Sequence, residues 1–363
     1  MIGRRGFLAA SAVLGTGAAA GAALGGCASG RSGGFWSEEP GRRPMRWGIK
    51  HSLQVTPDDA ELKLAKQLGL DYVHTWSSPP KYKELVARVE AAGLKMAKIG
   101  NNSVHNRAEL ALGLPGRDEK IEEFNRNLRA LADAGIRYQL YAHMATGTHN
   151  TGRAAVRGGA LARTFEEGKL PDLETASNRV VFDRPYTEKE MWENWEYFVR
   201  RVKPVAEETG VRIGIHPDDP PGLTLGNVPR CLFSSFEGYR RAIEIADSPN
   251  IGVGLCCGTW LEGGERVGRS VLDMIDYFGR RGKLFIIHFR NIDRPLPRFR
   301  ETFLNDGFMD MYKIIRRLAE VNFEGVLSAD HVPSTTGIPR AGEAYTVGYI
   351  QALIERANEE VFF

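Results

Sequence analysis

The stretch Val211-Arg-Ile-Gly-Ile-His216-Pro-Asp-Asp-Pro-Pro221 passes from an apolar run into a histidine, two aspartates and three prolines. The alternating apolar residues predict a buried β-strand. Proline cannot continue a central strand, so the strand ends here and its last side chains face a loop. Polar residues at the carboxyl end of a buried parallel strand are typical of the sites where α/β proteins carry out their chemistry.

Three later apolar runs end in the same way, with Leu255-Cys-Cys-Gly258, Ile287-His-Phe-Arg-Asn291 and Ala329-Asp-His331. If the four strands are neighbours in one barrel, their carboxyl ends meet on one side of its mouth. Histidine, cysteine and aspartate are common metal ligands. The sequence therefore predicts a metal site formed by His216, Cys256, His288 and Asp330.

Strand parity favours one of the two adjacent cysteines. Neighbouring residues of a strand point to opposite faces. His216 shares its face with Gly214, and Cys256 shares its face with Gly254, so Cys256 is the expected ligand and Cys257 is expected to pack outside the barrel. Two imidazoles, a thiolate and a carboxylate favour zinc by softness alone, although metal supply can override this preference.

From Met45 onward, apolar strands alternate with amphipathic helical patterns. Strands are expected at residues 45–52, 71–76, 95–99, 137–144, 211–216, 251–257, 284–291 and 325–330. Helices are expected at 58–68, 81–92, 118–134, 188–209, 236–246, 269–281, 310–321 and 344–358. Eight such units predict an α/β fold, a closed (β/α)8 or TIM barrel. A doubly wound open sheet is the alternative, but no glycine-rich phosphate turn follows the first strand.

One connection is too long for an ordinary loop of such a barrel. Residues 145–186, after the fourth strand, are rich in Gly, Thr and Arg and are expected to be irregular. They could cover the barrel mouth as a lid. The alternatives are a surface excursion or a contact in a homo-oligomer.

The first 27 residues have the features of an export signal. Arg4-Arg5 resembles a twin-arginine motif, an apolar region runs to Leu24, and Leu24-Gly-Gly-Cys27 resembles a lipobox. We expect twin-arginine export to the periplasm or cell envelope, with Cys27 lipid-anchored; ordinary cleavage nearby is the alternative. Residues 28–44 are expected to form a flexible tether, and residues 45–363 a single catalytic domain.

Charge and cysteine content exclude several classes of protein. Lys and Arg total 48 against 45 Asp and Glu, so nothing indicates a nucleic-acid partner. Arginine-rich surfaces suit a small anionic substrate. Four cysteines, two of them adjacent, do not form a disulfide framework. Membrane association is expected only through the N-terminal segment.

From Met45 to Ile354 the sequence resembles the mannonate dehydratase family of the xylose-isomerase-like barrels, as a divergent, exported member. The resemblance implies dehydration of D-mannonate to 2-keto-3-deoxy-D-gluconate. It also implies a divalent metal, usually Mn2+ with Zn2+, Mg2+ or Co2+ as alternatives, bound at His216, Cys256, His288 and Asp330. The matching stretches are Trp192-Glu-Asn194 with Phe198, Pro204-Val-Ala-Glu-Glu208, His216-Pro-Asp-Asp-Pro-Pro221, Asp247-Ser-Pro-Asn250, His288-Phe-Arg-Asn291, Met309-Asp-Met-Tyr312 and Asp330-His331.

The sequence departs from that family around the expected substrate site. Ser328-Ala329 stands where the family usually has Arg-Pro, and Trp76-Ser77 replaces a paired His-His. The other departures are Ala142-His-Met-Ala145 for Asn-Phe-Met-Pro, Val332 for Gly, and Gly342-Glu343 for Gly-Arg. We therefore expect weak or absent turnover of D-mannonate and better turnover of a related sugar acid or sugar derivative.

Residue types suggest roles around the metal. His331 is the first candidate for proton transfer, His143 is the second, and Asp330 belongs to the catalytic pair with His331. The substrate-binding candidates are Arg290, Asn291 and Asp218, of which Asp218, with Asp219, is also expected to orient ligands. A rim salt bridge is the alternative for Arg290.

Two alternative functions remain open at this point. One is a metal-dependent sugar or sugar-acid isomerase or epimerase on the same barrel, which needs the metal and proton transfer but no acid for a leaving group. The other is a sugar-acid-binding lipoprotein without catalysis.

Overall fold

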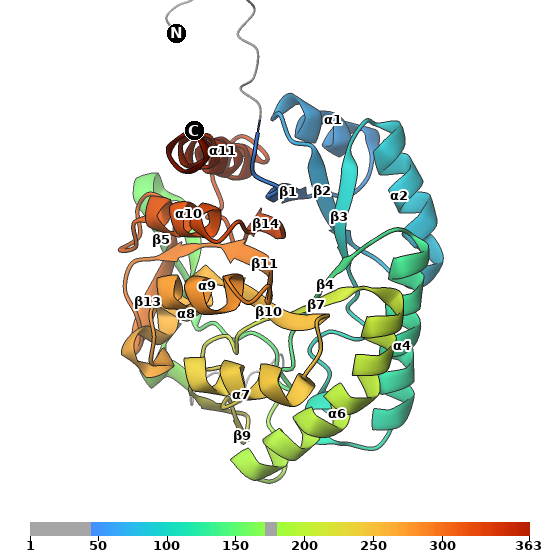
Figure 1. The fold of residues 1–363 in the computed structure, drawn as a ribbon. Coiled ribbons are helices and arrows are strands. Elements are labelled where there is room, and N and C mark those ends of the chain that lie inside the picture. Colours follow the sequence, from blue (N-terminus) through green and yellow to red (C-terminus); the bar gives the residue numbers. More distant parts are fainter. Residues whose placement is uncertain (1–44, 171–179) are drawn as a thin grey trace, which may run out of the picture. The chain divides into compact units, whose positions relative to one another are not determined.

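The computed structural model describes residues 45–170 and 180–363. In this part, parallel strands form the centre and helices surround them (Figure 1). The two edge strands of the eight-stranded sheet, β3 and β4, also lie against each other, so the sheet is nearly closed and the predicted barrel is confirmed. In sheet order the strands are β3 (Lys95–Gly100), β2 (Tyr72–Trp76), β1 (Lys50–Gln54), β14 (Val326–Ala329), β11 (Leu284–Phe289), β10 (Ile251–Cys256), β7 (Arg212–Ile215) and β4 (Tyr138–Tyr141).

Glycines allow β7 and β10 to pack closely inside the barrel. A Cβ atom on Gly254 would lie 2.8 Å from the carbonyl oxygen of Gly214 and 2.8 Å from Cδ1 of Leu140, closer than real Cβ contacts. Leu140 belongs to an apolar cluster with Tyr138, Ile286 and Val326, which come from β4, β11 and β14. The polar side chains that follow on these strands therefore lie over an apolar floor.

The helices agree with the amphipathic patterns, because their apolar faces cover the outside of the sheet. The predicted ranges 188–209 and 236–246 are matched by α6 and α7 exactly as the sequence indicates. Thr187 and Glu190 form a capping box at the start of α6, and Gly210, with a φ of 66°, ends it. The main helices are α1 (Asp59–Gln67), α2 (Tyr82–Ala91), α4 (Arg117–Asp133), α6 (Glu188–Thr209), α7 (Phe236–Ala246), α9 (Val271–Gly279), α10 (Met311–Glu320) and α11 (Ala341–Phe362).

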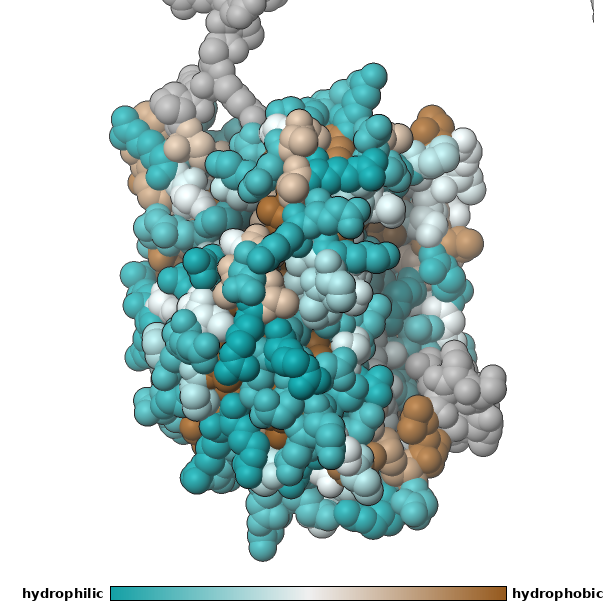
Figure 2. Space-filling model, turned by 90° about the vertical axis from the view of Figure 1, so that its right-hand side faces the viewer, coloured by the Kyte–Doolittle hydropathy of each residue, from teal (hydrophilic) through white to brown (hydrophobic). Residues whose placement is uncertain are grey.

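The outward faces of the helices are polar. The face shown in Figure 2 is mostly hydrophilic, with apolar residues scattered singly or in small groups. Within the residues that the structure describes, no helix is both long and apolar enough to cross a membrane. The expected signal and lipobox at residues 1–27 and the tether at 28–44 lie outside the described residues.

The insertion after the fourth strand is more regular than predicted. Two antiparallel strands, β5 (Gly152–Ala155) and β6 (Leu161–Glu166), form a hairpin within it. β6 pairs with β13 (Arg298–Thr302), which pairs with β12 (Asn291–Ile292) in the loop after the seventh barrel strand. The prediction that 145–186 is irregular was wrong for this hairpin, whose strand β6 also pairs with a segment more than 130 residues away in sequence.

Candidate metal centre

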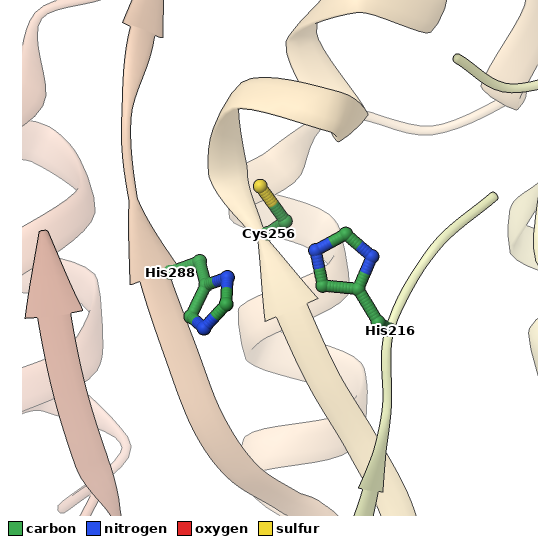
Figure 3. A group of neighbouring side chains, drawn as sticks. All are labelled: His216, Cys256 and His288. Carbon is green, nitrogen blue, oxygen red and sulfur yellow. The ribbon is translucent and has the colours of Figure 1, made fainter. Parts of the chain in front are cut away.

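Three of the four predicted ligands form a compact group. Donor atoms of His216, Cys256 and His288 all lie within 4.8 Å of one another. His216 directly follows β7, while Cys256 and His288 lie at the ends of β10 and β11. Figure 3 shows both imidazole rings and the sulfur facing the space between these strand ends. The barrel topology brings them together because β7, β10 and β11 are successive neighbours.

The two histidines are held in orientations that suit metal binding. Nδ1 of His216 donates a hydrogen bond to the Pro217 carbonyl at 2.7 Å, which leaves Nε2 as the unprotonated nitrogen. The His288 ring packs edge-on against it at 5.4 Å between centroids. Burial lowers the pKa of both imidazoles, so both are neutral, the form that binds a metal.

Cys256 contributes the sulfur, and Cys257 does not. Cys256 is the N-cap of α8 (Cys257–Gly263), whose Thr259 N–H donates to Sγ at 3.5 Å. Cys257 is buried in the large apolar cluster outside the group. Burial raises the pKa of the Cys256 thiol to about 11, while the neighbouring Arg290 opposes this rise. A bound cation would favour the thiolate further.

Asp330, the fourth predicted ligand, stands beside the three-residue group. Its Oδ2 lies 3.6 Å from Sγ of Cys256 and 3.8 Å from Nδ1 of His288. The same oxygen lies 3.3 Å from Nε of Arg290. Burial alone would raise the pKa of Asp330, but electrostatic interactions with the neighbouring His331, His288 and Arg290 side chains lower it below its usual range. Asp330 is therefore an ionised carboxylate facing the group.

Arg290 is not available to bind a substrate carboxylate. The residue is only 1% exposed. Its Nη1 donates to Glu262 at 2.7 Å and to Glu301 at 2.6 Å, and its Nη2 lies 3.3 Å from Asp219 and 3.4 Å from Sγ of Cys256. The substrate-clamp interpretation is therefore corrected: the guanidinium holds buried carboxylates and the cysteine in place. Gly258 makes room for it, since a Cβ there would lie 2.4 Å from Nε of Arg290.

Asn291 and Asp218 are likewise engaged within the protein. The Asn291 amide donates to the carbonyls of Leu304 and Met309, both at 2.8 Å. Asp218 accepts hydrogen bonds from the Phe233 N–H at 3.2 Å and the Ser234 hydroxyl at 2.9 Å. These contacts position the loops, as was expected for Asp218, and the role of both residues in substrate binding stays a prediction.

His331 is the most accessible titratable residue of the group, at 30% side-chain exposure. Its Nδ1 lies 2.8 Å from Oε1 of Glu301, and its Nε2 lies 3.5 Å from Oδ1 of Asp330. Nη1 of Arg163, from β6, lies 2.8 Å from each ring nitrogen. The residue has a φ of 46°, a left-handed conformation that is unusual outside glycine and is often found at functional sites.

His143 lies in an aromatic cage. Its ring contacts Tyr141, Trp195, Phe198 and Phe233, and the Tyr141 hydroxyl lies 2.7 Å from Nδ1. Burial lowers the pKa of His143 to about 3, so the ring does not take up a proton near neutral pH. These surroundings favour a packing role, while the role of His143 as the second proton-transfer candidate stays a prediction.

Several residues of the site were not predicted from the polar residues at the strand ends. Arg163 comes from the insertion and Glu301 from β13, and neither position carries a motif of its own. Glu262 lies on α8, five residues beyond Cys257. His74 and Lys98 lie within β2 and β3, and an alternating inner face containing histidine and lysine was the signal that could have identified them.

The donor set fits a divalent cation. Imidazole and thiolate donors around one ion come within a few ångströms of one another, as they do here. Nδ1 of His288 is buried and has no hydrogen-bond partner in the described part of the chain. A buried nitrogen without a partner is costly unless something binds it. These residues can therefore hold a divalent metal.

Comparison with known proteins identifies the family of the chain. The family model described as D-mannonate dehydratase (UxuA) matches residues 73–181 and 159–359. Mannonate dehydratase 2 of Halalkalibacterium halodurans is 31% identical over 277 residues, covering 69% of this chain and 78% of its own length. A mannonate dehydratase of Streptococcus equi subsp. zooepidemicus is 29% identical over 303 residues, covering 77% of this chain and 80% of its own.

Solved structures show the same fold. Mannonate dehydratase from Streptococcus suis serotype 2 superposes with a TM-score of 0.74 at 24% identity, covering 86% of this chain and 95% of that chain. L-ribulose 3-epimerase gives a TM-score of 0.57 at 15% identity, covering 86% of this chain and 96% of that chain. The IolI protein with a bound zinc atom gives 0.54 at 15% identity, covering 86% and 97%. From the family model and the curated relatives, the chain belongs to the D-mannonate dehydratase family.

Proposed function

We propose that this protein is a metal-dependent hydro-lyase that removes water from D-mannonate or a closely related sugar acid to form a 2-keto-3-deoxy sugar acid. The observation that carries the proposal is the pairing of the His216–Cys256–His288 group with Asp330 and the accessible His331. Membership of the D-mannonate dehydratase family supports the same reaction.

Different residues of the chain have different roles in the proposed reaction. Dehydration next to a carboxylate needs a base that takes the proton from C2 and an acid that assists departure of the C3 hydroxyl. His331 holds and moves a proton, because it is partly exposed and lies between the carboxylates of Glu301 and Asp330. Arg290 keeps Asp219, Glu262 and Glu301 in place. A bound divalent cation would stabilise negative charge developing next to the carboxylate.

For the metal we propose Mn2+. The softness of the cysteine and histidine donors favours zinc, whereas the carboxylate of Asp330 suits manganese, and the family resemblance favours manganese. Elemental analysis of the protein purified from its own compartment decides between the two metals.

The test is an assay of metal-loaded protein against a panel of aldonic and uronic acids, with detection of 2-keto-3-deoxy products and of epimers. We expect a 2-keto-3-deoxy product, with D-mannonate a weaker substrate than a related acid. Epimers without loss of water would instead identify an epimerase. Binding without any product would identify a binding protein.

A pair of variants tests the proton carrier. His331→Ala should lower kcat by about 10²-fold or more with near-normal metal content, because it removes proton transfer. His143→Phe is the matched comparison, since it substitutes a histidine that lies among aromatic rings. Full activity of His331→Ala would refute His331 as the proton carrier. Loss of activity in folded, metal-loaded His143→Phe would move that role to His143.

A further inference from the structure

A buried ammonium group lies in the barrel without a close ion-pair partner among the described residues. Lys98, on β3, is 5% exposed. No carboxylate among the described residues lies within the 4.0 Å ion-pair distance of its Nζ, whereas the other fully buried cation of the site, Arg290, contacts four carboxylates. Burying a charge is costly unless it is paired.

The strand register places Lys98 on the inner face of the barrel. Paired residues of parallel strands share a face, and Lys98 pairs with His74 of β2. Nδ1 of His74 lies 3.0 Å from the hydroxyl of Ser52, which is linked by strand register through Ser328 to His288 of the metal group, so His74 points inward. Two residues further along, Gly100 pairs with Trp76, and a Cβ on Gly100 would lie 2.5 Å from the Trp76 ring. Lys98 and Gly100 therefore share the inner face.

The same register connects this side of the barrel to the metal group. Ser52 pairs with Ser328, and Ser328 pairs with His288. His288 in turn pairs with Cys256. A continuous inner layer thus runs from β3 through β2, β1, β14 and β11 to β10. Lys98 stands on the side of this layer away from Cys256.

The electrostatics agree with this placement. Burial lowers the pKa of His74 and of His288, and the positive charge of Lys98 lowers both further. Burial lowers the pKa of Lys98 to about 8, and the negative charge of Asp330 opposes this. Lys98 is therefore mostly protonated at neutral pH and lies within electrostatic reach of the metal group.

The adjoining wall offers another polar group without a partner. His105, in the loop after β3, packs edge-on against Trp76 at 5.3 Å between ring centroids. Its Nδ1 is buried and has no hydrogen-bond partner in the described residues. The β2–β3 side of the mouth thus presents a cation, a nitrogen and an aromatic ring.

We propose that Lys98 binds the carboxylate of the substrate from the β3 side of the barrel, opposite the metal ligands, and thereby selects sugar acids over neutral sugars. The inference rests on the proposed function for the substrate class. It replaces Arg290, which is fully paired, as the cation that recognises the acid. An anion entering this layer would provide Lys98 with the close ion-pair partner that no described residue supplies.

The test is calorimetric binding by metal-loaded wild type and Lys98→Met, with D-mannonate and the tightest-binding acid of the panel, and with D-mannitol as the neutral analogue. Loss of one charged hydrogen bond should weaken acid binding about 10- to 100-fold. Affinity for D-mannitol and metal content should not change. Lys95→Met is the matched control, because Lys95 lies at the exposed start of the same strand.

Thermal melting separates recognition from a structural role. Without substrate, Lys98→Met should melt at or above the wild-type temperature, because it removes an unpaired buried charge. The inference would be overturned if Lys98→Met melted at a lower temperature and bound the acids as tightly as wild type. It would also be overturned if Lys98→Met were as stable as wild type and bound the acids with unchanged affinity. If wild type binds acids without turning them over, the proposed dehydratase function is refuted, but the test of Lys98 still holds. If wild type binds no acid, both the proposed function and the role of Lys98 are refuted.

Discussion

The substitution Arg290→Met should lower the stability of the barrel more than removal of any surface arginine. The guanidinium is 1% exposed and lies within 3.3 Å of carboxylate oxygens of Asp219, Glu262, Glu301 and Asp330. Methionine fills much of the volume but leaves these carboxylates without their cation. Removing one partner of a buried ion pair costs about 3–5 kcal/mol.

This free energy corresponds to a measurable change in melting temperature. The entropy of unfolding is about 2.1 cal/mol/K per residue, or about 0.7 kcal/mol/K for the roughly 320 residues of the unit 45–363. The variant should therefore melt about 4–7 °C below wild type. Circular dichroism melts of metal-free protein at one scan rate measure the difference without the contribution of metal binding.

The matched control is Arg300→Met, on β13. Arg300 pairs with Asp293 at 3.0 Å, but its side chain is largely exposed to solvent, so its loss should cost less than about 1 kcal/mol. Equal melting temperatures for the two variants would refute the reasoning, because the buried network would then contribute no more than a surface pair.

The difference should also depend on pH with a defined sign. Burial would raise the pKa of Asp219, but the charges of Arg290 and Arg163 lower it below its usual 3.8. A carboxyl whose pKa is lowered by folding contributes stability above its unfolded pKa and loses that contribution as pH falls through the folded value. The gap between wild type and Arg290→Met should therefore be full at neutral pH and narrow below about pH 4.

Two further predictions concern the metal and the N-terminus. Cys256→Ser should lose most of the metal in elemental analysis while Cys257→Ser keeps it, because only Cys256 faces His216 and His288; the opposite pattern would move the sulfur ligand to Cys257. We also propose that the mature protein is tethered through a lipid on Cys27, so Cys27→Ala should leave the membrane fraction, and a wild type already found in the soluble fraction would contradict the lipobox.

Local sequence patterns predicted much of the fold and the three residues at the centre of the site. Apolar alternation, helix caps and the glycines after the helices indicated eight strand–helix units, because these signals depend only on neighbours within a few residues. Chain order then made the fifth, sixth and seventh strands neighbours. Strand parity placed His216 and Cys256 on the inner face with Gly214 and Gly254, and the structure has both there.

Tertiary structure alone decided which polar residues face one another. The hairpin in the insertion depends on pairing with β13, so the approach of Arg163 and Glu301 to His331 has no local signature. Arg290 looked available at a strand end, but three-dimensional packing surrounds it with acids distant in sequence. A register shift between β2 and β3 sets Lys98 beside His74. Pairings of this kind join residues far apart in the chain, so they follow from cross-strand register and packing and not from the period of any one segment.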